Sequence, residues 1–118
     1  MKKLSALHPF GAENVFIKKA THFIRIPKND IRYVKVTGKY CQIVCDKDKF
    51  LVQMPMKKLL ETLAGDDFIR IHRNIIINLN AVKKLNLNDN YIELMDGTSL
   101  PLSREGKRDF SNRIQMLT

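Results

Sequence analysis

The chain has 118 residues, 44% of them hydrophobic and 28% charged, which suits one folded domain with its own core. No apolar run approaches the ~18 residues of a membrane span, so we expect no insertion into a membrane. The formal net charge of +9, from 21 Lys and Arg against 12 Asp and Glu, points to a polyanion as partner.

The first residues differ from the rest of the chain. Residues 1–14 contain Pro9 and Gly11 and have no clear period, so we expect a leader or linker remnant before a domain at residues 15–118. The N-terminus also lacks the longer apolar stretch of a secretory signal. The sequence therefore predicts a cytoplasmic protein.

Five segments then show the short apolar and polar alternation of β-strands. They are residues 15–19, 22–26, 31–36, 40–45 and 50–54. Gly38 permits a sharp reversal between the third and the fourth. Cys41 and Cys45 would share one face of the fourth strand about 13 Å apart, too far for a disulfide or a shared zinc, so we expect small core or half-buried residues.

A short helix is predicted to begin at Pro55, whose φ angle suits a first-turn position. Its apolar side chains fall on one stripe at helical spacing: Met56, Leu59, Leu60 and Leu63. Gly65 stands where a left-handed residue would end the helix, which we expect to lie on a sheet.

Residues 68–78 combine an apolar framework with a high density of hydrogen-bond donors. Phe68, Ile69 and Ile71 predict a short strand, and residues 75–77 are expected to bury a following turn of chain. Four polar side chains stand between them: Arg70, His72, Arg73 and Asn74. A core does not accommodate four such groups together, so we expect some of them to face outward.

The C-terminal part returns to the strand pattern at residues 82–88, 91–95 and 98–102. Asp96-Gly97 between two β-rich runs is a strong hairpin signal, and Pro101 favours an edge strand. A helix is predicted over 103–117, beginning with Ser103 as a capping residue. It would place Phe110, Ile114 and Leu117 on one side and Arg104, Lys107 and Arg108 on another.

Together these elements predict a mostly β protein, with elongated antiparallel sheets of about eight or more short strands, one short packing helix and a C-terminal helix. The sequence contains no P-loop, dinucleotide turn, nucleophile elbow or zinc signature. We therefore expect that the protein is not an enzyme and that it has no catalytic residue, cofactor or metal site. His72 beside Arg73 is more often a structural hydrogen-bonding group than a general base.

The order of motifs over roughly residues 15–117 resembles the LytTR-type DNA-binding domain of bacterial transcription and response regulators. Five stretches carry the resemblance: Asp30-Ile31-Arg32-Tyr33-Val34, Gly38-Lys39-Tyr40, Met56-Lys57-Lys58-Leu59, Phe68-Ile69-Arg70-Ile71-His72-Arg73 with the later Asn78, and Pro101-Leu102-Ser103-Arg104 after the Asp96-Gly97 turn. Taken together they are specific, although no single one would be.

The resemblance implies that loops, not a recognition helix, enter successive major grooves of a bent duplex that carries paired direct repeats, with a homodimer forming on the DNA. Base contacts would then fall to Lys39, Arg73 and Arg104. Phosphate contacts or supporting roles would fall to Arg70, His72, Asn74, Ser103 and Lys107. The receiver domain of many family members is absent from this sequence, so we expect either an excerpt of a longer regulator or a stand-alone one.

Several residues depart from the pattern of the family. Asn74 and Ile75 stand where a serine and an aromatic residue are usual, and Lys39 replaces a frequent asparagine. These changes bear on base preference, because Asn and Lys contact other base edges than Ser and Asn do. The residues leave two alternatives open: a basic β-domain that binds RNA, and a protein-interaction module without nucleic-acid specificity.

Overall fold

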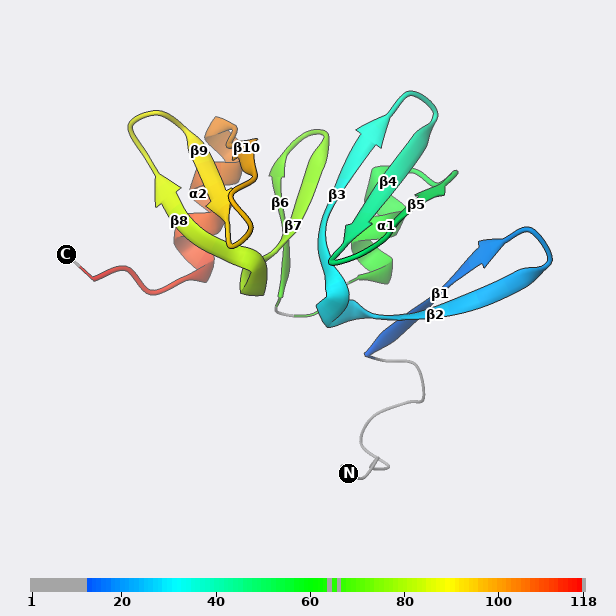
Figure 1. The fold of residues 1–118 in the computed structure, drawn as a ribbon. Helices are drawn as coiled ribbons and strands as arrows, with labels where there is room; N and C mark the ends of the chain where they lie inside the picture. Colours follow the sequence, from blue (N-terminus) through cyan, green and yellow to red (C-terminus); the bar gives the residue numbers. More distant parts are fainter. Residues whose placement is uncertain (1–12, 64, 66, 118) are drawn as a thin grey trace, which may run out of the picture.

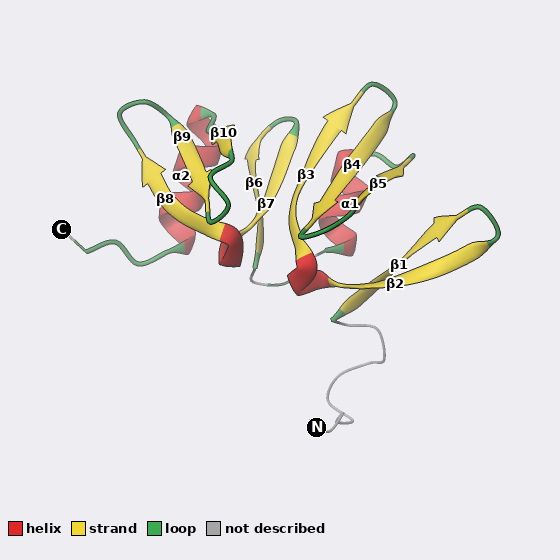
Figure 2. Cartoon of the chain, viewed as in Figure 1, coloured by secondary structure: helices red, strands yellow, loops and turns green. Residues whose placement is uncertain are grey.

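The computed structural model describes residues 13–63, 65 and 67–117. Within these residues the chain forms ten strands and two α-helices, shown in sequence colours in Figure 1 and by element type in Figure 2. The strands are β1 (Asn14–Lys19), β2 (His22–Pro27), β3 (Ile31–Thr37), β4 (Tyr40–Cys45), β5 (Lys49–Val52), β6 (Phe68–His72), β7 (Ile75–Asn78), β8 (Val82–Asn86), β9 (Tyr91–Leu94) and β10 (Ser99–Pro101). The α-helices are α1 (Met56–Thr62) and α2 (Arg104–Arg113).

The strands form three antiparallel sheets. The central sheet has five strands in the order β5-β4-β3-β7-β6, a second has the order β10-β9-β8, and β1 and β2 make a separate two-stranded ribbon. The predicted mostly β, antiparallel fold with two helices is confirmed. Pro101 lies in an edge strand, as predicted, because proline has no N–H to donate and the outer side of an edge strand needs no donor.

The two faces of the central sheet each belong to a different apolar core. One core joins this sheet to α1 and the ribbon, and the other joins it to the three-stranded sheet and α2. Strand β7 shows the arrangement most clearly, since Ile76 lies in the first core and Ile75 and Ile77 lie in the second. A strand buried on both faces has an uninterrupted apolar sequence. The prediction that residues 75–77 bury a turn of chain was therefore wrong, and they form an inner strand.

Two further expectations about the helices need correction. Helix α2 ends at Arg113 and does not reach residue 117 as expected. Ile114 still packs on the second core, but Leu117 is 94% exposed. Pro55 is the residue before α1 and not part of its first turn, because its ψ of 145° is extended. Met56, Leu59 and Leu63 are buried in the first core, as the stripe predicted.

Both cysteines are free and buried in β4, in agreement with the sequence. Burial raises the pKa of the Cys45 thiol to about 11. The predicted leader falls mostly in residues 1–12, which lie outside the described part of the chain.

Candidate nucleic-acid interface

The turn between β6 and β7 is closed by side chains of the same hairpin. Arg70 donates from Nη2 to the carbonyl oxygen of Arg73 at 2.6 Å, and the backbone N–H of Asn74 donates to Nδ1 of His72 at 3.1 Å. The ladder slips between Arg70 and His72, which lets both side chains reach the turn. The carbonyl oxygen of Asn74 in addition accepts from the N–H of Val36 in β3 at 3.0 Å. Three hydrogen bonds therefore fix this turn.

This bracing divides the polar residues of the turn into two kinds. Arg70 and His72 are half-buried and hold the backbone, whereas Arg73 and Asn74 are exposed at the tip. An acceptor Nδ1 places the proton of a neutral His72 ring on Nε2. The sequence indicated all four residues as a group. It could not show which of them hold the turn and which are exposed at its tip.

The first turn of α2 is docked directly beside this hairpin. The hydroxyl of Ser103 accepts from the N–H of Gly106 at 2.9 Å, so Ser103 is the N-cap that the sequence predicted. Both the N–H and the hydroxyl of Ser103 lie within hydrogen-bond distance of the Ile71 carbonyl oxygen, at 2.9 and 3.1 Å. Arg104, one residue further, is exposed next to the braced turn.

Gly106 is the residue that makes this docking possible, and the sequence reasoning missed it. A Cβ atom at this position would lie 1.9 Å from the Ile71 carbonyl oxygen. The available signal was a glycine inside a predicted helix, where it costs about 1 kcal/mol relative to alanine and calls for a packing reason. A shallow hollow of about 200 Å³ beside the contact brings together Arg70, His72, Arg73, Ser103, Glu105, Gly106 and Asp109.

The remaining predicted residues come from two other elements. Lys39 is exposed in the turn between β3 and β4, which Gly38 allows by its φ of +63°. Lys107 is half-buried and donates from Nζ to the carbonyl oxygen of Leu87 at 3.2 Å, so it ties α2 to the β8–β9 turn. Figure 1 shows the β3–β4 turn, the β6–β7 turn, the start of α2 and the β8–β9 turn along one edge of the molecule.

We call this edge, with Lys39, Arg73, Asn74 and Arg104 at its tips, the turn edge. The side chains of these four residues are three cations and one amide, which donate hydrogen bonds to phosphate and to base edges. The β8–β9 turn adds the exposed side chains of Asn88 and Asn90, with the exposed carboxylate of Asp89 between them. Its conformation is fixed by the N–H of Asp89, which donates to Asn86 Oδ1 at 2.8 Å.

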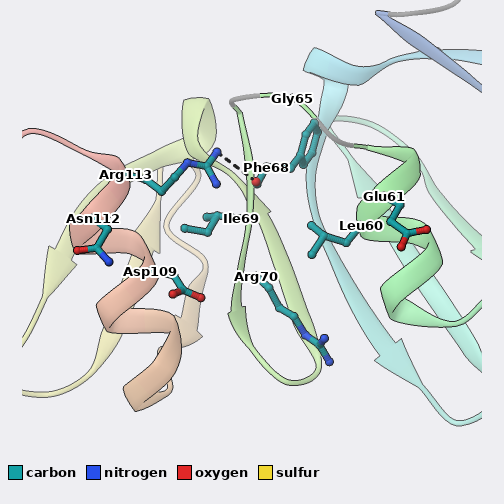
Figure 3. A pocket seen from close by; sticks show the side chains of 9 residues that line it. All are labelled: Leu60, Glu61, Gly65, Phe68, Ile69, Arg70, Asp109, Asn112 and Arg113. Carbon is teal, nitrogen blue, oxygen red and sulfur yellow. Dashed lines mark hydrogen bonds between the residues drawn. The ribbon is translucent and has the colours of Figure 1, made fainter.

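A separate hollow of about 500 Å³ lies between α1 and α2 over strand β6, away from the tips (Figure 3). Leu60, Phe68 and Ile69 give it an apolar floor, and Arg113 closes one side by donating to the Phe68 carbonyl oxygen at 3.4 Å. Charges of both signs surround it. Among the described residues no group of three or more His, Cys, Asp or Glu side chains could hold a metal ion. Within the same residues, no helix is long and apolar enough to cross a membrane.

The fold and the turn edge define a small basic β-domain that presents its polar contacts on turns. The family model of the LytTr DNA-binding domain matches residues 21–115, and the chain belongs to this family. The family is described by DNA binding and not by a reaction.

The names of similar proteins also refer to transcription regulation or DNA binding. The transcriptional regulatory protein YpdB of Escherichia coli strain K12 is 26% identical over 102 residues, which is 83% of this chain and 42% of that protein. YpdB of Shigella flexneri matches to the same extent. The chain thus spans about two fifths of the length of these relatives. A Bacillus cereus structure, the LytTr DNA-binding domain of a protein described as a methyl-accepting/DNA response regulator, has a TM-score of 0.75 at 20% identity and covers 86% of this chain and 95% of its own.

Proposed function

We propose that residues 15–118 bind double-stranded DNA sequence-specifically, with turns in the major groove, as the effector domain of a bacterial transcription regulator that works in the cytoplasm. One observation carries this proposal: Lys39, Arg73 and Arg104 belong to three elements far apart in the sequence and emerge along one edge. A surface whose cations only keep the domain in solution would not need Arg73 on a braced turn and Arg104 on a docked helix. The family to which the chain belongs supports DNA as the partner.

The braced geometry suggests a role for each residue. Arg73 and Arg104 have the planar donor fork that pairs with O6 and N7 of guanine, while Lys39 brings a mobile point charge. Asn74 can pair with adenine. Arg70, His72 and Ser103 hold the turn and the helix in place, and any phosphate contact of theirs would add to that role. Lys107 would contact phosphate only by leaving the Leu87 carbonyl oxygen.

The size of the domain fits a contact with about one turn of duplex. Its principal dimensions are 45 × 36 × 25 Å, and one turn of B-DNA is roughly 34–36 Å long. We propose that two copies occupy paired direct repeats in promoters and form a homodimer on the DNA. Control by a receiver or sensor domain would come from outside these 118 residues.

Binding selection on random duplexes tests the proposal. We expect an enriched motif at moderate salt, and an affinity that falls steeply as salt rises, because neutralised phosphates release counterions. Recovery of unenriched sequences would refute sequence specificity. Binding that responds to salt but ignores sequence would support the rival module without nucleic-acid specificity.

A second candidate rests on the ribbon. Phe16 and Phe23 are 49% and 65% exposed, and the register places them with Lys18 and Arg25 on one face. Aromatic side chains beside cations can stack on single-stranded bases. Competition between duplex DNA and single-stranded RNA for the chain separates the candidates: displacement of the duplex by RNA, with its loss in Phe23→Ala, would favour RNA.

A further inference from the structure

The turn between β8 and β9 presents two amides that no contact within the domain explains. Residues 87–90 form this turn and all of them are exposed. Among the residues that the structure describes, the side chains of Asn88 and Asn90 have no hydrogen-bond partner. Figure 1 shows the turn on the turn edge, beside the start of α2 and at the end farthest from the β3–β4 turn. Both amides are therefore available to a partner at that edge.

Neighbouring elements hold the turn in place. Lys107 of α2 donates from Nζ to the Leu87 carbonyl oxygen at 3.2 Å. The N–H of Leu102, just before α2, donates to the Asn90 carbonyl oxygen at 2.9 Å. The two bonds attach both ends of the turn to the segment that carries Arg104. A side chain on such a fixed base loses little freedom when it binds.

The chemistry of the turn favours base edges over phosphates. Residues 87–90 contain no cation, and the exposed carboxylate of Asp89 repels a phosphate. This carboxylate has a partner within the hairpin, because Asn86 Nδ2 donates to Asp89 Oδ2 at 3.3 Å. The amides on either side of it can each donate and accept, as the pairing of asparagine with N6 and N7 of adenine requires. A contact of this turn with DNA is therefore a contact with bases.

The bond between Leu102 and Asn90 also limits which bases the turn can reach. Arg104 follows Leu102 by two residues, which is at most about 7 Å of chain. Hydrogen-bonded neighbours in a sheet lie about 5 Å apart, so Asn90 lies within roughly 12 Å of Arg104. One base pair corresponds to about 3.4 Å of duplex. With the reach of the side chains, the bases contacted by Asn90 and Arg104 are within about five base pairs of each other.

We propose that the β8–β9 turn is a fourth DNA-contacting element, in which Asn88 and Asn90 contact base edges next to the base pair contacted by Arg104. This inference rests on the proposed function. It extends the recognised sequence on the side of Arg104 that faces away from Lys39, following the order of the turns along the edge (Figure 1). The turn contributes to sequence preference without adding positive charge.

The variants that test the inference should fold. Asn90 has a φ of +56°, so Asn90→Gly removes the amide and keeps a residue that tolerates this conformation. Asn88→Ala removes the other amide at an exposed position. Asn112→Ala is the matched control, because Asn112 is an exposed asparagine of α2 that lines the hollow away from the tips. Urea denaturation should give midpoints close to that of the unchanged chain for all three.

The first experiment is binding selection on random duplexes with the unchanged chain and each variant. Asn88→Ala and Asn90→Gly should each lose base preference at one or two outer positions and keep the rest of the motif. Arg104→Ala marks the reference position, and the lost positions should lie within about five base pairs of it. Asn112→Ala should give the unchanged motif. An unchanged motif in both turn variants would overturn the inference.

The second experiment measures affinities on the selected duplex, on a duplex with the outer base pair replaced, and on a random duplex. The unchanged chain should lose about tenfold when the outer base pair is replaced, as for a mismatch. Asn90→Gly should lose about tenfold on the selected duplex and less than about twofold more on the replaced one, because the contact is already gone. Equal losses of Asn90→Gly on selected and random duplexes would indicate a phosphate contact and overturn the inference. Absence of any enriched motif with the unchanged chain would instead refute the proposed function.

Discussion

Two turns reach the turn edge by different means. The β6–β7 turn is fixed by Arg70 and His72, and α2 is docked beside it through Ser103. In the β3–β4 turn, Thr37 pairs with Tyr40 across two residues, and the described residues show no side-chain hydrogen bond within it. The first turn therefore presents Arg73 on a rigid base, while the second presents Lys39 on a hairpin that depends on its ladder.

The difference shows how one edge can combine rigid and adaptable contacts. A contact on a rigid base loses little freedom when it binds, so more of its interaction appears as affinity and specificity. A lysine on a less constrained hairpin can follow the phosphate or base that it meets. We expect the β6–β7 turn to dominate base preference and the β3–β4 turn to adjust to it.

The strongest way to break the comparison is to remove the docking of α2. In Gly106→Ala the new Cβ would lie 1.9 Å from the Ile71 carbonyl oxygen, so helix or strand must shift. We expect the free energy of unfolding to fall by about 3 kcal/mol or more, measured by urea denaturation. Asn112→Ala, at an exposed position of the same helix, should change it by less than about 0.5 kcal/mol. Equal stability of Gly106→Ala and the unchanged chain would contradict the tight contact.

The second test compares the two tips directly on DNA. Arg73→Ala should cost about 1–3 kcal/mol of binding and relax preference at one base position, if it contacts a base edge. Lys39→Ala should cost less and weaken binding to specific and random duplexes alike, as expected for an adaptable point charge. Titrations on both kinds of duplex measure the two losses. The comparison between rigid and adaptable turns fails if Lys39→Ala relaxes base preference more than Arg73→Ala does.

A smaller effect is expected from the brace itself. His72→Ala leaves the Asn74 N–H without its acceptor, so the turn should loosen at a cost of about 0.5–1.5 kcal/mol. Hydrogen exchange of the Asn74 amide should accelerate, and affinity for the selected duplex should fall. His22→Ala is the matched control, because His22 is exposed on the ribbon and its hydrogen bond is with the neighbouring Thr21. Unchanged exchange at Asn74 in His72→Ala would show that the histidine does not brace the turn.

The sequence predicted local structure well where the pattern itself is local. The alternation of residues 22–26 predicted a strand and the Asp96-Gly97 turn predicted a hairpin, and the structure contains both. It was wrong for residues 75–77, because a short apolar run does not distinguish an inner strand from other buried chain. The hydrogen bonds of Arg32 to Asp46 and Asp96 could not be predicted either, since these carboxylates are 14 and 64 residues away from it in the sequence. Local periodicity carries no information on which distant carboxylates meet an arginine.

At neutral pH the smallest expected effect concerns the base of the β3–β4 hairpin, where Cys45 lies buried at the end opposite Lys39. Burial raises the pKa of Cys45 from 9.0 to about 11, so the folded chain keeps a proton that the unfolded chain loses. The thiol thus leaves stability unaffected below pH 9 and lowers it as the pH rises from 9 to 11. Urea denaturation of the unchanged chain and of Cys45→Ala at several pH values measures this contribution, because the difference between them should shrink over that range. The same burial should make Cys45 slow to react with a thiol reagent at neutral pH in the folded state and fast in urea. Rapid labelling of Cys45 without urea would mean that the base of this hairpin opens readily, and the adaptability assigned to its tip would then belong to the whole hairpin.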